Sequence, residues 1–312
     1  RDLVRSRGLG DVYKRQLMDA KAIGQLGTDA EKQVKEQNGD LEVNSVTGTD
    51  GKLYGVPYTD NTWFMYYNKS KITEDEAKDF DTILSKAKVA FSLQNSWYIN
   101  GFYDGLSLFG EKGNDADAGM VFPKDGADIT SYLVDVVANP NFSNDDGASG
   151  LAAIKDGSAD VLFSGTWSAK DVKEALGDNY AATSLPTFTV NGQKKQMKSF
   201  AATKAAAYNP NAKNPKAAAQ FAAYLGSTEA QKLHYEMRAI PPTDKSLSDL
   251  TTDDVAAKAQ ADTMANTALL QSGLSGMNDW WTPAETFGKA LVNKEITKDS
   301  AAAKYQDCLL YT

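Results

Sequence analysis

The sequence lacks the residues on which most metal sites and covalent mechanisms depend. Its 312 residues include only one cysteine, Cys308, and one histidine, His234. This scarcity excludes disulfide frameworks, Cys–His catalytic pairs and the clustered ligands that zinc requires. The sequence also contains no Walker-type or dinucleotide-binding glycine motif, no serine elbow and no His-Glu-x-x-His pattern. We therefore expect no metal and no cofactor.

An excess of positive charge and long apolar runs are missing as well. The chain has 33 Lys and Arg residues against 41 Asp and Glu residues, which gives a net charge of −8 and an isoelectric point near 4.9. Nucleic acids and anionic membranes attract clustered Lys and Arg, so we expect neither as a partner. No stretch of 18 apolar residues occurs, so the sequence predicts no membrane-spanning helix.

Both ends differ in composition from the rest of the chain. Residues 1–16 contain four of the five arginines, and residues 308–312 contain the only cysteine. We interpret both end segments as non-native sequence, with a disordered basic arm as the alternative for residues 1–16. The segment has no apolar central run, so it is not a signal peptide. Neither end enters the functional interpretation.

Short apolar runs alternate with helical patterns along the chain. Residues 63–70, 88–94 and 159–165 are rich in aromatic and aliphatic side chains and have the length of buried strands. Residues 98–110 and 150–157 are expected to be helices. This alternation predicts an α/β fold with largely parallel sheets.

Three local patterns predict how elements begin and end. Thr73 and Glu76 have the spacing of a capping box. An Asn-Gly pair between two short runs predicts a tight hairpin over residues 187–196. Pro215 opens a helix whose inner face would carry four apolar residues, Ala218, Phe221, Ala222 and Leu225.

All five tryptophans occur in polar contexts at predicted strand ends and in loops. They are Trp63, Trp97, Trp167, Trp280 and Trp281. Ligands of open α/β sheets bind outside the carboxyl ends of strands, where we expect Trp97 and Trp167. An aromatic ring can stack on the C–H face of a sugar while neighbouring amides and hydroxyls bind its rim. The pattern favours a sugar site; the alternative is that each ring is an ordinary core residue.

Five segments, in this order, resemble bacterial extracellular solute-binding proteins of the maltose/maltodextrin type, which serve ABC importers. The first two are DGKLYGVPYTDNTWFMYYNKS (50–70) and KVAFSLQNSWYINGFYDGLSLFG (88–110). The third runs from GLAAIKDG through FSGTW to LPTF (150–188), and the fourth is SFAATKAAAYNPNAKNPKAAAQFAAYL (199–225). MNDWWTPAETFGKAL (277–291) is the fifth, so the resemblance extends over about residues 17–307.

The resemblance implies a two-lobed α/β fold of the type II periplasmic-binding-protein class. Residues 17–60 and 206–252 would form an N-lobe, which we expect to be incomplete because the family's first strands and helix have no counterpart here. Residues 64–200 and 255–312 would form the C-lobe. The chain would cross between the lobes near residues 60–63, 201–205 and 252–255.

The family's site residues, carried onto matching positions, imply a ligand site and no catalytic residue. A Trp after each of two strands and an aromatic C-terminal segment would hold the sugar, and polar residues near the crossing would bind its hydroxyls. The implied set is Trp97, Trp167, Trp281, Asn95, Ser96, Asp60, Asn61, Trp63, Trp280 and Glu285. Asn61 and Asn95 replace acids found at these positions in the family, and Glu285 stands where an Arg can occur.

The resemblance further implies a substrate-binding protein that captures maltodextrin-like oligosaccharides by hinge closure and delivers them to a membrane permease. It would be an exported monomer, lipid-anchored at the cell surface or periplasmic. A glycosidase-like enzyme with an aromatic-lined cleft, a binder of another neutral oligosaccharide and a structural or adhesive domain are the alternatives. We expect a neutral ligand, because Arg238 is the only arginine after residue 16 and only Lys170 lies near a Trp in sequence.

Overall fold

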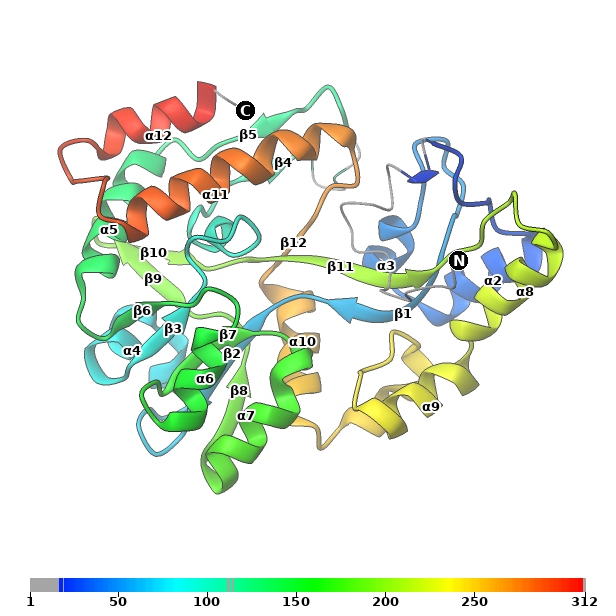
Figure 1. Ribbon diagram of the computed structural model, residues 1–312, viewed down its shortest axis with the longest axis horizontal. Helices are drawn as coiled ribbons and strands as arrows, with labels where there is room; N and C mark the ends of the chain where they lie inside the picture. Colours follow the sequence, from blue (N-terminus) through cyan, green and yellow to red (C-terminus); the bar gives the residue numbers. More distant parts are fainter. Residues whose placement is uncertain (1–16, 19, 111–112, 114, 311–312) are drawn as a thin grey trace.

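The computed structural model describes residues 17–18, 20–110, 113 and 115–310, and its described part forms two lobes of unequal size (Figure 1). The residues 1–16 that we interpret as non-native lie outside the described part. The larger lobe is built on a five-stranded sheet of order β6 (Phe142–Asn144), β3 (Val89–Phe91), β7 (Val161–Ser164), β2 (Phe64–Asn68) and β8 (Tyr180–Thr183). A three-stranded sheet of order β1 (Val56–Asn61), β11 (Ser199–Ala206) and β12 (Ala268–Leu270) lies between the lobes.

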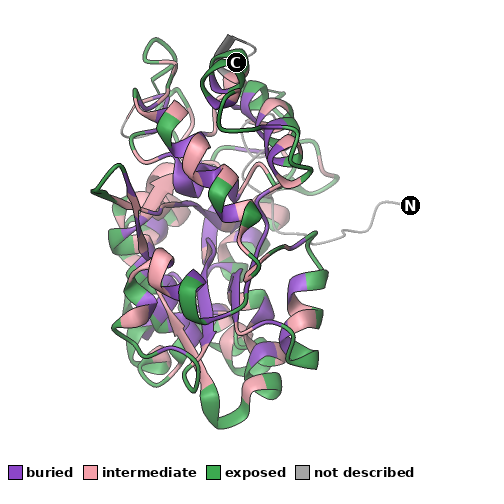
Figure 2. Ribbon diagram, turned by 90° about the vertical axis from the view of Figure 1, so that its left-hand side faces the viewer, coloured by how far each residue is buried: buried purple, intermediate pink, exposed green. Residues whose placement is uncertain are grey.

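Helices surround the larger sheet, and Figure 2 shows buried strands enclosed by partly exposed helices. None of the helices in the described part is long and apolar enough to cross a membrane. The helices of the larger lobe are α4 (Phe80–Lys86), α5 (Gly126–Ala138), α6 (Ser149–Asp156), α7 (Ala169–Leu176), α10 (Val255–Asn266), α11 (Asn278–Val292) and α12 (Ala301–Leu310). The smaller lobe contains α2 (Thr28–Gln37), α3 (Asp40–Ser45), α8 (Pro215–Leu225) and α9 (Thr228–Arg238).

Two paired strands carry the chain between the lobes. β1 and β11 are antiparallel, with Val56 opposite Ala206 and Asn61 opposite Ala202. The chain leaves β1 and enters the larger sheet at Phe64 after only two further residues. α10 then returns to the larger lobe, where it packs on β8 and β2. The crossing strands therefore form a continuous connection between the two lobes.

The predicted strands and hairpin are present, but the sheets are mixed. β3 is parallel to β6 and β7, whereas β2 is antiparallel to β7 and β8. The prediction of largely parallel sheets is wrong here, because β2 arrives from the other lobe and runs against its neighbours. The hairpin joins β9 (Thr187–Val190) to β10 (Gln193–Gln196), and both turn residues have positive φ, +50° at Asn191 and +76° at Gly192.

Aromatic packing forms the core of the larger lobe. Phe91 of β3 packs edge to face on Phe163 of β7, with ring centroids 4.9 Å apart, and on Phe102 at 5.2 Å. Trp63 joins this group at 5.7 Å from Phe91, and all four side chains are fully buried. Burial of such large apolar surfaces is the main stabilising contribution and fixes the sheet against the helices.

Residues 98–110 do not form the predicted helix. A short 3-10 helix covers Ile99–Phe102, and the two-residue strand β4 (Ser107–Leu108) follows and pairs with β5 (Met120–Val121). Gly105 has a φ of +92° and Phe109 a φ of +60°. These left-handed conformations interrupt a right-handed helix, and hydrophobic spacing alone does not reveal them.

The predicted inner face of α8 is confirmed only in part. Ala222 is buried, but the side chain of Phe221 is 60% exposed and that of Leu225 is 41% exposed. The described part of the smaller lobe has a small core, and it does not extend over these side chains. That core consists of Leu26, Val34, Val46, Leu53, Val56 and Ala205.

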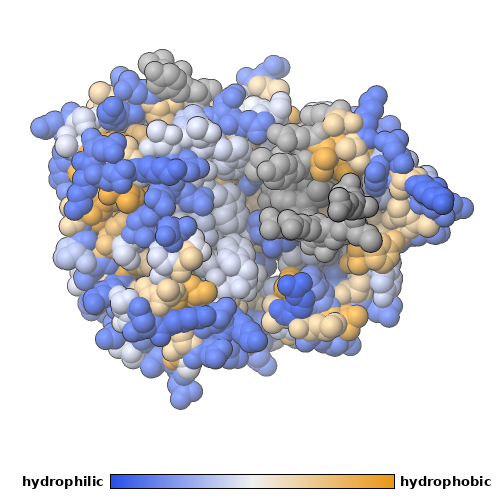
Figure 3. Space-filling model, viewed as in Figure 1, coloured by the Kyte–Doolittle hydropathy of each residue, from blue (hydrophilic) through white to orange (hydrophobic). Residues whose placement is uncertain are grey.

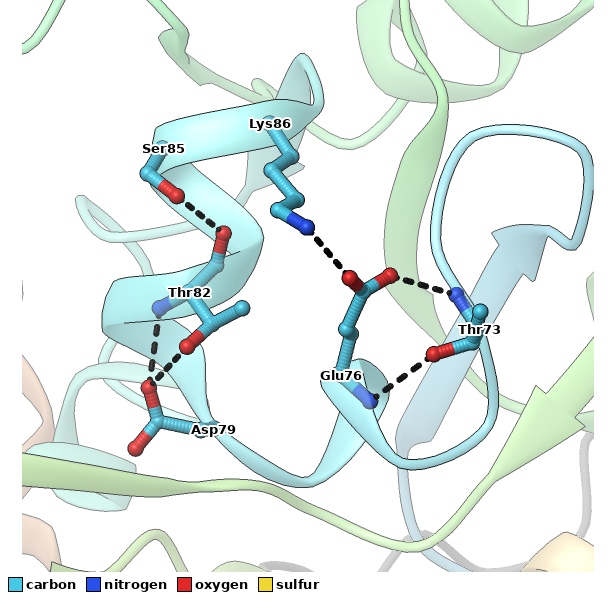
Figure 4. A network of polar contacts seen from close by, with 6 residues as sticks. All are labelled: Thr73, Glu76, Asp79, Thr82, Ser85 and Lys86. Atoms are coloured by element: carbon cyan, nitrogen blue, oxygen red, sulfur yellow. Dashed lines mark hydrogen bonds and ion pairs between the residues drawn. The ribbon is translucent and has the colours of Figure 1, made fainter.

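The predicted capping box is confirmed, and it precedes a second cap (Figure 4). The backbone N–H of Thr73 donates to Glu76 Oε2 at 2.9 Å, and the N–H of Glu76 donates to Thr73 Oγ1 at 3.3 Å. Lys86 also pairs with this carboxylate, and its hydrogen bond is the main cause that lowers the pKa of Glu76 to about 2. Helix α4 itself begins one turn later, where Asp79 Oδ1 accepts from the N–H of Thr82 at 2.8 Å.

We predict that Asp79→Ala lowers the free energy of unfolding by about 1 kcal/mol, because the first turn of α4 loses its side-chain acceptor. Urea denaturation of the wild type and the variant measures this change. Asp75→Ala is the matched control, because Asp75 is 92% exposed and its only ion pair within the described part of the chain is with exposed Lys78. Equal effects of the two substitutions would contradict this role of Asp79.

Candidate functional site

Four strand ends meet at one edge of the larger sheet. β3, β6 and β7 are parallel, so their carboxyl ends share this edge. β2 is antiparallel to them, and its first residue, Phe64, lies opposite Ser164 at the end of β7. The loops after β3 and β7 and the end of the β1 crossing therefore come together. Figure 3 shows that the surface recedes between the two lobes.

The loops after β3 and β7 bring two tryptophans together. The ring centroids of Trp97 and Trp167 are 6.0 Å apart, and the ring planes are inclined by 38°. The side chain of Trp167 is 49% exposed, and Trp97 is half-buried. Tyr66 of β2 stabilises the turn between β7 and Trp167, because its hydroxyl donates to the carbonyl of Gly165 at 2.8 Å. The pair presents an exposed aromatic surface at the sheet edge.

Polar contacts hold the loop after β3 in place. The exposed Asn95 accepts a hydrogen bond from the N–H of Trp97 at 2.8 Å through its Oδ1. Buried Asp145, which follows β6, accepts from the N–H groups of Gly147 at 2.9 Å and Gly150 at 2.8 Å. The same carboxylate accepts from the hydroxyl of Ser92 at 3.3 Å. Asp145 thus joins the start of α6 to the loop that carries Trp97.

Two of the five tryptophans are core residues, which corrects their assignment as ligand contacts. Trp63 is fully buried, and its indole N–H donates to the carbonyl of Trp97 at 3.0 Å. Trp280 is 3% exposed, and its N–H donates to the carbonyl of Ser96 at 2.9 Å. Both rings therefore support the loop that carries Trp97 and present no surface to a ligand. Ser96 itself is half-buried, and its carbonyl is engaged in this way.

The remaining assigned residues occupy the crossing and α11. Trp281 is half-buried on Phe200 of β11, with ring centroids 5.9 Å apart. Glu285 lies one turn further along α11, exposed and paired with Lys289 at 2.5 Å. Asp60 and Asn61 are half-buried at the end of β1, opposite Thr203 and Ala202 of β11. The structure records a ring contact between Trp97 and Trp167 and none between Trp281 and either of them among the described residues.

Gln271 and Lys204 also touch the tryptophan pair, and the sequence interpretation missed both. The indole N–H of Trp97 donates to Gln271 Oε1 at 2.9 Å, and the N–H of Gln271 donates to the carbonyl of Ala201. Lys204 of β11 places its ammonium nitrogen 5.9 Å from the centroid of the Trp167 ring. Both contacts depend on the pairing of distant strands, which no local pattern shows. Lys204 is therefore a lysine near a tryptophan in space, whereas Lys170 is near one in sequence.

His234 and Arg238 lie on α9 of the smaller lobe. His234 packs on Tyr58 with ring centroids 5.6 Å apart. Burial lowers the pKa of His234 below its usual value of 6.5, and the nearby charges of Arg238 and Lys204 lower it further. Among the described residues, no group of His, Cys, Asp and Glu could hold a metal ion.

We predict that Gly165→Ala displaces the Trp167 ring. A methyl group at this position would lie 2.1 Å from ring atom Cζ3, which is far inside van der Waals contact. Because the exposed ring can rotate into solvent, we expect a changed tryptophan emission spectrum and a loss of less than about 1 kcal/mol in unfolding free energy. Gly27→Ala is the control, since nothing lies within 4 Å of its added methyl. An unchanged spectrum would contradict the close packing of Trp167 on Gly165.

We predict that His234 makes the protein less stable at acid pH. Its pKa is lowered in the folded state, so the unfolded chain binds the proton more tightly, and stability is lost as the pH falls below about 6.5. The loss levels off below the folded pKa. His234→Gln should gain stability relative to the wild type between pH 7.5 and pH 5 in urea denaturation. A difference between the two proteins that stays constant over this range would contradict the lowered pKa.

Comparisons with known proteins place the chain in a family. The family model described as bacterial extracellular solute-binding protein matches residues 10–265. A maltooligosaccharide ABC transporter solute-binding lipoprotein of Streptococcus pneumoniae R6 is 29% identical over 240 residues, which cover 69% of this chain and 56% of the relative. A galactooligosaccharide-binding protein of Bacillus subtilis is 28% identical over 290 residues, with coverages of 82% and 66%. The chain thus spans little more than half the length of the first relative.

Solved structures agree with this assignment. A structure determined with acarbose superposes with a TM-score of 0.92 at 41% identity, covering 96% of this chain and 81% of the other. The ligand-free maltodextrin-binding protein MalE1 of L. casei superposes with a TM-score of 0.85 at 25% identity and the same coverages. The predicted two-lobed α/β fold class is confirmed by these matches. The chain belongs to the family of bacterial extracellular solute-binding proteins.

Proposed function

We propose that the protein captures a neutral oligosaccharide of the maltodextrin class between its lobes and delivers it to an ABC permease. The observation that carries this proposal is the pair of Trp97 and Trp167, which presents a half-exposed aromatic surface where strand ends meet the crossing strands. An indole face suits the C–H face of a sugar ring. In this proposal the side chains of Asn95, Asn61 and Asp60 would bind hydroxyl groups of the sugar, and Trp281 and Glu285 of α11 would add further contacts.

The lobes would bind by hinge closure, with residues 17–60 and 206–252 moving against residues 64–200 and 255–312. Short crossings support this division, because β1 and β11 pair at the junction and α10 packs back on the larger sheet. A ligand that contacts both lobes stabilises the closed form and shifts the population toward it. The same proposal includes an exported monomer, anchored by lipid or free in the periplasm, which is consistent with the solute-binding lipoprotein of S. pneumoniae.

The descriptions of the relatives and the contacts of two carboxylates favour binding over glycoside hydrolysis. A glycosidase needs two carboxyl groups that flank the scissile bond, one of them able to donate a proton. Asp145, at the sheet edge, accepts hydrogen bonds from two backbone N–H groups and from Ser92, and Glu285 is paired with Lys289. The relatives are likewise described by the sugars they bind or by the transporter they serve.

A galacto-oligosaccharide is the second candidate ligand. The relative from B. subtilis described as a galactooligosaccharide-binding protein matches 82% of this chain, a larger share than the maltooligosaccharide relative matches. Both ligands are neutral and present C–H faces for stacking. Parallel calorimetric titrations with maltotriose and a galactotriose distinguish them, because the cognate sugar should bind with higher affinity.

We predict that Trp167→Ala weakens maltotriose binding by about 1–3 kcal/mol in titration calorimetry, because a stacking surface is removed. Tyr224→Ala is the matched control, since Tyr224 is 47% exposed on α8, away from the tryptophan pair. Chromatography of the incubated sugar tests for hydrolysis in the same samples. Unchanged affinity in Trp167→Ala would contradict the site, and the appearance of glucose or maltose would favour the enzyme.

A further inference from the structure

Lys204 brings a positive charge from the crossing strand onto an aromatic ring of the larger lobe. It lies in β11, opposite Thr59 of β1. Its ammonium nitrogen is 5.9 Å from the centroid of the Trp167 ring, within the range of a cation–π interaction. Lys204 and Trp167 are distant in sequence and come together only in the folded structure. The contact therefore links the inter-lobe sheet directly to the exposed tryptophan.

Other groups already restrict the surroundings of the Trp167 ring. Its six-membered ring lies against Gly165, where a Cβ would come within 2.1 to 2.6 Å of three ring atoms. The ring of Trp97 is 6.0 Å away and inclined by 38°. Access for a stacking partner is therefore limited, and Lys204 stands over part of the ring that is left.

We propose that Lys204 is a specificity-determining residue that covers Trp167 and must move aside when a sugar ring stacks there. This inference rests on the proposed oligosaccharide site. The lysine stem is long and flexible, and its ammonium gains a modest attraction from the exposed ring. A neutral sugar can stack on the ring only after the attraction between Lys204 and the ring is lost. Part of the stacking energy of the sugar offsets this loss, so Lys204 lowers the affinity. A ligand that bears a cation meets an additional repulsion from Lys204.

Substitutions at Lys204 should change maltotriose affinity in opposite directions. Lys204→Ala removes the competing charge and stem, so binding should tighten about two- to fivefold, which is the affinity equivalent of a cation–π contact at an exposed site. Lys204→Arg should bind more weakly than the wild type, because a guanidinium stacks better on indole. Lys204→Met keeps the stem without the charge and should fall between the wild type and Lys204→Ala.

Lys170→Ala is the matched control for charge, because Lys170 is exposed three residues after Trp167 and forms no ring contact among the described residues. It should leave the affinity unchanged. Weaker binding by Lys204→Ala would overturn the proposal, since it would mean that the lysine donates to the sugar. Unchanged binding across the three Lys204 variants would overturn it as well.

A measurement without sugar separates this inference from the proposed function. Five tryptophans labelled with 5-fluorotryptophan give ¹⁹F resonances, and Trp167→Phe identifies the one from Trp167. Lys204→Ala should shift that resonance in the ligand-free protein, and Lys170→Ala should not. A resonance unaffected by Lys204→Ala contradicts the contact even if maltotriose binds. If the resonance shifts but the wild type binds neither maltotriose nor galactotriose, the contact is present and the oligosaccharide site is contradicted. The proposed displacement of Lys204 by sugar is then contradicted as well.

Discussion

The parallel alignment of β3 and β7 is the constraint on which the site depends. It places the loops that follow both strands at the same edge of the sheet, so that Trp97 and Trp167 meet. The aromatic core beneath them fixes this alignment, since Phe91 and Phe163 pack on each other from the same two strands.

Much of the site consists of groups that hold Trp97 in place. The carbonyls of Ser96 and Trp97 accept from the buried indoles of Trp280 and Trp63. Gln271, at the end of the β12 segment, accepts from the indole of Trp97 itself. The loop is thus bound to both sheets and to α11. Trp97 is therefore held by hydrogen bonds from several segments, whereas Trp167 beside it is more exposed.

The sequence predicts the positions of Trp97 and Trp167 well, because a strand followed by a polar loop is a local pattern. It does not distinguish these residues from Trp63 and Trp280, which also have polar neighbours. In the structure the partners of those two indoles are backbone carbonyls, and residue type carries no information about them. The contact of Lys204 with Trp167 could not be predicted from the sequence for a different reason. It depends on the position of β11, which crosses beside the larger lobe.

The same difference between local and distant interactions explains the outcomes for the fold. The capping box at Thr73 and the hairpin turn at Asn191 involve neighbours in sequence, and both are confirmed. The antiparallel entry of β2 and the exposure of Phe221 depend on which segments pack together. The sequence predicted largely parallel sheets and an inward-facing Phe221, and both predictions were wrong. Side-chain type and spacing determine the first class of feature, whereas the arrangement of the whole chain determines the second.

The most direct test of the account is a crystal structure of the protein grown with saturating maltotriose. The account predicts a sugar ring stacked on Trp167 between the lobes, with Trp97 beside it. Maltotriose bound at a surface remote from both rings, or no bound sugar at saturating concentration, would contradict it.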